Sequence, residues 1–157
     1  MKANEHTRVV AIANKFDSLV EVDSICKQRL ALFIIRFKID TFSYKEALFM
    51  IKDLKKANHT TQSVPLEIEL TLLRARLYSR QVKLILAMNM LHKADRYLKL
   101  LGATYLSPEQ LSLYRAEHLD ILREASLASK ELINAHQAIL KMSKLSSNFL
   151  DNAISLA

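Results

Sequence analysis

Apolar residues recur along this chain at the three- and four-residue spacings of amphipathic helices. The spacing is heptad from 66 to 101, and a second heptad run begins after Pro108. The seam positions of this second run are Leu111, Tyr114, His118, Ile121, Ala125, Ala128, Leu132, Ala135, Ile139, Met142, Phe149, Ala153 and Leu156. The pattern predicts a fold built from helices, because strands would need an alternating period of two.

The leucines at positions 70, 77, 84, 91 and 98 lie seven residues apart, a spacing that also suits a dimerising zipper. The same stretch is apolar at Leu72, Ile85 and Met90 as well. Its hydrophobic arc is therefore wider than the seam of a two-stranded coiled coil. We expect this stretch to pack against its own chain.

Composition supports an all-α fold of one domain over residues 1–157. Glycine occurs once and proline twice, whereas sheet-rich and loop-rich folds use both at their turns. Half of the residues are hydrophobic and 25% are charged, which is typical of a globular chain. A length of 157 residues suits a single domain with a sizeable core.

Several residues mark where helices should begin and end. Ser18, Ser43 and Ser107 are each followed three residues later by Glu or Gln, which is the capping-box pattern of a helix start. Gly102 is expected to end a helix in the left-handed conformation. The polar run 58–63 should be a connection.

An internal repeat is visible among small and apolar residues. Ala47, Ile51 and Leu54 recur with the same internal spacing as Ala87, Leu91 and Ala94, and once more as Ala128, Leu132 and Ala135. In addition, Ala75 precedes Ala87 by twelve residues, and Ala116 precedes Ala128 by the same interval.

This pattern resembles the tetratricopeptide repeat, a helix–turn–helix unit of about 34 residues. The resemblance covers mainly 66–145 and loosely 19–58. The chain departs from the family at Val82 and Arg123, where a turn glycine is expected, and it lacks the repeat-ending proline. Two architectures therefore follow: an array of antiparallel helical hairpins, or a bundle of long helices in which 66–101 is one rod of about 55 Å.

No motif for catalysis, cofactor binding or metal binding is found. The five histidines are never three or four residues apart, so no local zinc or di-iron motif forms. The seam position of His118 favours a hydrogen-bonded core histidine. One glycine cannot build a phosphate-binding loop, and the single cysteine, Cys26, makes neither an internal disulfide nor a thiolate cage. We expect a protein without cofactors that is not an enzyme.

The net charge of +7 is unevenly distributed. Residues 42–106 hold eleven Lys and Arg against five Asp and Glu, whereas 107–157 hold five against six. Arg76, Arg80 and Lys83 share one helical face. The resemblance implies a concave groove that Arg29, Leu32 and Arg36 line in one unit and Leu72, Arg76, Ser79 and Arg80 line in the next. The alternative is that these cations form only a solvated face.

Guanidinium groups suit carboxylates, so the sequence predicts an adaptor, chaperone or regulator that binds an acidic or amphipathic protein segment in this groove. The alternative function is a basic helical regulator that binds nucleic acid through phosphate contacts. The longest apolar run, Leu30 to Ile35, is far shorter than a membrane span. We expect a cytoplasmic protein.

Overall fold

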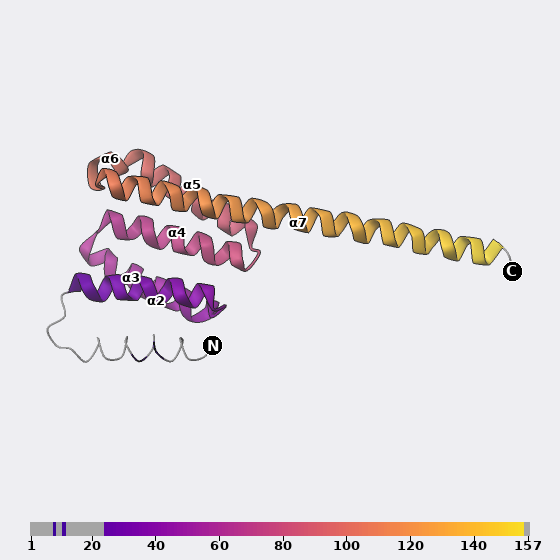
Figure 1. Ribbon diagram of the computed structural model, residues 1–157, viewed down its shortest axis with the longest axis horizontal. Coiled ribbons are helices and arrows are strands. Elements are labelled where there is room, and N and C mark those ends of the chain that lie inside the picture. The colour runs from indigo at the N-terminus through magenta and orange to yellow at the C-terminus, as the bar shows by residue number, and fades with distance from the viewer. Residues whose placement is uncertain (1–7, 9–10, 12–23, 156–157) are drawn as a thin grey trace.

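The computed structural model describes residues 8, 11 and 24–155, so the predicted helix start at Ser18 lies outside the described residues. The described residues form helices and no strand, which confirms the all-α prediction (Figure 1). The helices are α2 (Ser24–Asp40), α3 (Tyr44–Thr61), α4 (Val64–Arg80), α5 (Leu84–Leu100), α6 (Gly102–Tyr105) and α7 (Pro108–Ser155).

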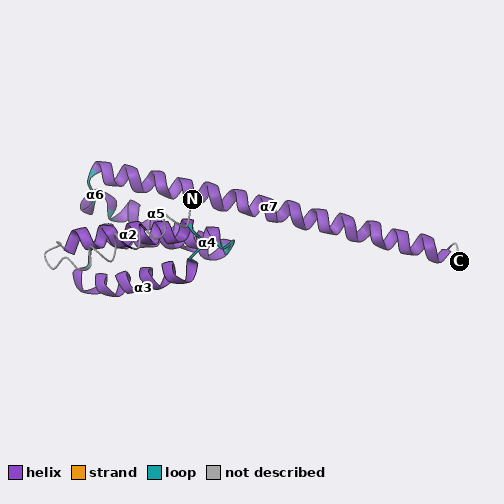
Figure 2. Cartoon of the chain, turned by 60° about the horizontal axis from the view of Figure 1, so that its bottom comes forward, coloured by secondary structure: helices purple, strands orange, loops and turns teal. Residues whose placement is uncertain are grey.

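Two antiparallel hairpins, α2–α3 and α4–α5, stack side by side, and the first half of α7 lies along α4 and α5 (Figures 1 and 2). The stretch 66–101 is thus a hairpin and not one long rod. The stretch 108–155 is the opposite case, because no turn interrupts it near Arg123. Ala47 and Ala87, which are equivalent in the sequence repeat, lie in α3 and α5, the second helices of the two hairpins.

The two hairpins turn in the same way, at positions that are equivalent in the repeat. Phe42 has φ 62° and Val82 has φ 58°, so each adopts the left-handed conformation that usually belongs to glycine. The following amide donates to the carbonyl five residues back, from Ser43 to Lys38 at 2.8 Å and from Lys83 to Tyr78 at 2.9 Å. This is the Schellman ending of a helix, formed here without glycine.

Glycine at position 82 should stabilise the protein. A β-branched residue with positive φ costs of order 1–3 kcal/mol, which exceeds the entropy that glycine loses on folding, so Val82→Gly is expected to raise the free energy of unfolding by about 1 kcal/mol. Gln81→Gly is the matched control, because Gln81 has φ −83° and its replacement should be destabilising instead. Urea denaturation compares the two, and equal losses of stability would contradict the strain at Val82.

The core consists of two clusters on opposite sides of α4. Leu66, Leu70, Leu73 and Leu77 pack toward α2 and α3, together with Ile35, Ile39, Ala47 and Ile51. On the other side, Ile68, Leu72 and Ala75 pack against α5 and α7, together with Leu91, Ala94, Leu98 and Ile121. Because α4 is covered on both sides, its hydrophobic arc has to be wide, as the sequence indicated.

Helix α7 has 48 residues, about 70 Å of helix, and among its described side chains only those before position 130 are covered. Tyr114, Ile121 and Ala125 are buried against the hairpins. Every side chain from 130 to 144 is exposed, and Figures 1 and 2 show this part of α7 extending past the stack. In the described part of the chain, no helix is long and apolar enough to cross a membrane.

The expected helix ends are confirmed in part. Ser107 and Gln110 form the predicted capping box, with the Gln110 amide donating to the Ser107 hydroxyl at 3.2 Å and the Ser107 amide donating to Gln110 Oε1 at 3.0 Å. The Ser43 side chain makes no such bond. The prediction for Gly102 was wrong: its φ is not positive, and it begins the short helix α6 under the side chain of Leu111.

Candidate partner-binding surface

Three residues that we predicted to line a groove lie in the protein interior. Leu72 is fully buried, and Leu32 and Ser79 are 7% and 3% exposed. Leu72 and Ser79 are inaccessible because α4 lies between the α2–α3 hairpin and α7, so both of its sides face other helices. Leu32 on α2 is inaccessible because it belongs to the core cluster that α2 and α3 form with α4. The groove prediction is wrong for these three positions.

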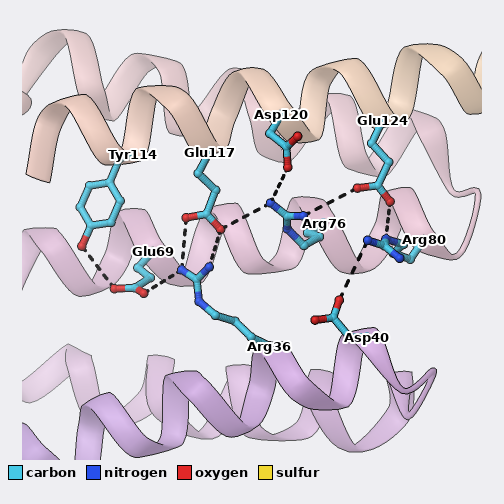
Figure 3. Close-up of polar contacts among 9 residues, drawn as sticks. All are labelled: Arg36, Asp40, Glu69, Arg76, Arg80, Tyr114, Glu117, Asp120 and Glu124. Atoms are coloured by element: carbon cyan, nitrogen blue, oxygen red, sulfur yellow. Dashed lines mark hydrogen bonds and ion pairs between the residues drawn. The ribbon is translucent and has the colours of Figure 1, made fainter.

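Three of the predicted arginines do come together, but they meet carboxylates of the same chain (Figure 3). Arg36 on α2 donates two hydrogen bonds to Glu117 on α7, at 2.9 and 3.2 Å, and one to Glu69 on α4 at 3.0 Å. The Glu117 side chain is only 9% exposed. Arg36 thereby links three helices that are distant in the sequence.

The pairing continues along α4 toward the hairpin turns. Arg76 donates to Asp120 at 3.1 Å and has Glu124 at 3.8 Å. Arg80 forms an ion pair with Glu124 and has Asp40 at 4.0 Å. We call this set of charged residues the ion-pair ladder: Arg36, Asp40, Glu69, Arg76, Arg80, Glu117, Asp120 and Glu124 (Figure 3).

The ladder places five carboxylates around three guanidinium groups and so has a net negative charge. An acidic segment would therefore meet carboxylates that already occupy the arginines. Sequence reasoning missed these carboxylates, although Glu117, Asp120 and Glu124 are spaced i, i+3, i+7 and so share one face of α7. Asp120 and Glu124 are four residues apart, as Arg76 and Arg80 are on α4, and this shared interval was the available signal.

The two remaining predicted residues lie outside the ladder. Arg29 is exposed near the start of α2, and Lys83 is exposed in the turn before α5. The predicted set of site residues therefore divides into a buried group, an internally paired group and two exposed cations. It does not form one continuous groove.

Tyr114 extends the ladder at its buried end, where its hydroxyl donates to Glu69 at 3.2 Å (Figure 3). Burial of the phenol and the negative charge of Glu69 raise the pKa of Tyr114 well above the value of about 10 expected for an unfolded chain. Arg36 also has a raised pKa: burial opposes its charge, but Glu117 and Glu69 outweigh that effect.

Tyr114 should make the protein less stable at high pH. Its folded pKa is raised, so the unfolded chain ionises first as the pH passes about 10, and the stability that the neutral phenol contributes below this pH is progressively lost above it. Urea denaturation from pH 8 to 11 should give a shallower loss of stability for Tyr114→Phe than for the wild type. Equal slopes would contradict this role of Tyr114.

Other polar groups of the described residues also serve the fold. His118 is hydrogen-bonded to the Leu91 carbonyl at 3.0 Å, as predicted, but its side chain is half-buried and lies at the edge of the core. An open cleft of about 390 Å³ lies beside the α3–α4 turn, but its buried Asn58 is already bonded to the amide and the carbonyl of Ser63. No three His, Cys, Asp or Glu residues within the described ranges lie close enough together to hold a metal ion.

The described residues also expose a line of apolar side chains on α7. We call Leu132, Ala135, Ile139 and Met142 the projecting seam. Its three large residues are 50%, 64% and 69% exposed. The seam continues the heptad line whose earlier members, Tyr114, Ile121 and Ala125, are buried against α4 and α5. The stripe was predicted from the sequence, but where its cover would end was not.

No protein-family model, curated protein or solved structure matches the chain, so its resemblance to the tetratricopeptide repeat stays a prediction.

Proposed function

We propose that the protein is a non-enzymatic protein interaction module that binds an amphipathic helix along the projecting seam of α7. The observation that carries this proposal is the change in burial along one heptad line, from Ile121 at 0% exposed to Ile139 at 64%. A contiguous apolar patch on a protein surface marks an interaction site. Its helical spacing suits a partner that is itself a helix.

The ion-pair ladder supports this function by fixing the direction of α7. Its contacts join α7 to α2 and α4 just before the helix leaves the stack. A side chain held by several charge-assisted bonds from different helices gives a defined geometry. The seam is thus presented on a helix whose base cannot swing freely.

This proposal modifies the partner that the arginines suggested. Selection of an acidic segment by Arg36, Arg76 and Arg80 has lost its support, because all three arginines are paired with carboxylates of their own chain. The alternative function, binding of nucleic acid through its phosphates, loses the support of the same three arginines. Apolar burial along α7 then supplies the binding energy.

Photo-crosslinking in the native cell tests the proposal. A benzophenone amino acid at position 139 should give a discrete protein adduct, whereas the same group at Lys130, on the opposite side of α7, should not. Leu132→Lys should remove the adduct at 139, because a charge would then enter the apolar contact. Equal labelling from both positions, or none from either, would contradict this function.

A further inference from the structure

The apolar heptad line by which the first half of α7 contacts the hairpins continues into its second half. The α4–α5 hairpin covers the heptad line up to Ala125, which is 2% exposed. Ala128 is half-buried, and from Leu132 to Met142 the line is exposed. A partner that covers the rest of the line would therefore contact α7 from the point where the chain's own α4–α5 hairpin ends its cover.

We propose that the partner is a second copy of this chain, whose projecting seam packs antiparallel against the first. This inference rests on the proposed function and names the occupant of the same surface. A symmetric pair uses the same patch twice, so each large seam residue both covers a partner residue and is covered by one. Each copy then covers the part of α7 that the other copy leaves open.

The fold itself selects the antiparallel direction. Paired helices lie about 8–10 Å apart, and each copy already has its hairpins against the seam side of α7. In a parallel, in-register pair, both sets of hairpins would have to fit between the two α7 helices at the same level, where that gap is too narrow. In an antiparallel pair, each stack lies beyond the end of the other copy's α7.

The extent of the hairpin cover along α7 limits the antiparallel register. When Ile139 of one copy faces Met142 of the other, position 155 of each helix is level with position 126 of its partner. This is where the α4–α5 hairpin ends its cover. A shift of one heptad further inward would drive the partner into Ile121, which is already buried.

The hairpin turns provide an apolar surface that the end of the partner helix can contact. Both turns lie at the end of the stack from which α7 projects (Figures 1 and 2). They expose apolar side chains there, with Phe42 at 71%, Val82 at 48% and Ile85 at 80%. An antiparallel partner brings its own α7 toward these turns.

Disulfide and bismaleimide crosslinking tests both the occupant and the direction. With Cys26→Ser as background, Met142→Cys should crosslink two copies, because equivalent positions then lie about 5 Å apart along the helix axis. Leu132→Cys is the matched variant on the same seam, and its equivalent positions should be about 25 Å apart and give no short crosslink. Crosslinking of both variants would indicate a parallel pair and overturn the antiparallel one.

Light scattering after size exclusion should give twice the chain mass of 18.0 kDa. Leu132→Lys with Ile139→Lys should weaken self-association at least about a hundredfold, because two charges would enter a dry seam. Leu127→Lys is the control, since Leu127 is 58% exposed on the side of α7 away from the seam. Circular dichroism should give the same helix content for the wild type, the double lysine variant and Leu127→Lys at the concentration at which the wild type dimerises.

The outcomes separate this inference from the proposed function. A monomer at every soluble concentration overturns the second copy as occupant, and so does a dimer that survives both lysines. If the chain is monomeric while position 139 still crosslinks to a different protein in cells, the interaction function stands and only the self-pairing fails. If neither dimer nor adduct forms, both fail.

Discussion

Ile121→Ala is expected to lower the free energy of unfolding by about 3 kcal/mol, within the range measured when a large buried aliphatic residue is truncated. Ile121 is fully buried in the cluster that α7 shares with α4 and α5. Side chains of α4, α5 and α7 itself form this cluster, so the site cannot collapse easily around the lost methyl groups and a cavity remains. Urea denaturation monitored by circular dichroism measures the loss.

Leu119→Ala is the matched control on the same helix. Leu119 is 59% exposed, so its truncation should change stability by no more than about 0.5 kcal/mol. Similar losses for the two variants would mean that α7 does not dock through Ile121. The pair of measurements therefore tests the placement of α7 on the hairpins.

Arg36→Met is expected to cost about 2 kcal/mol, between the values typical of exposed and buried ion pairs. The Met side chain has a volume similar to that of the methylene stem of Arg36, so the loss of stability comes mainly from removal of the guanidinium group. Without it, the nearly buried Glu117 keeps only the more distant Arg76, whose terminal nitrogen lies 3.8 Å away. Added salt should reduce the difference, because Arg36 is partly exposed.

Arg29→Met controls for the loss of a positive charge on α2. Arg29 is exposed and lies outside the ladder, so we expect a change within about 0.5 kcal/mol. Glu117→Gln in both backgrounds completes a double-mutant cycle, and a coupling energy above about 0.5 kcal/mol would support the pair. Additive losses would remove Arg36 as the link between the helices.

The hairpin architecture was accessible from the sequence, but the choice between hairpin and rod was not. The turn between α4 and α5 contains Gln81, Val82 and Lys83, none of which breaks a helix as glycine or proline does. The stretch 108–155 also has no glycine, and its only proline is at the helix start. Similar local patterns gave opposite outcomes because folding back at Val82 buries Ala87 and Leu91 against α4.

The ion-pair ladder shows a similar division. The shared face of Arg76 and Arg80 followed from their helical spacing, whereas Arg36 was placed beside them only by the repeat resemblance. Most of the carboxylates that pair with these arginines come from α7, which is far along the chain from all three. Charge spacing within one helix is local information. Which face of α7 meets α4 is decided by packing of the apolar stripe, and only the tertiary fold specifies that packing.

The ion-pair ladder fixes the base of α7, so each position along the helix lies at a set distance from the hairpin stack. From position 125 to position 155 the helix extends by about 45 Å, with no glycine, proline or turn to kink it. Whatever binds along it is held at a set spacing and angle from the hairpin stack. In the proposed pair, this geometry would set the distance between the two hairpin stacks.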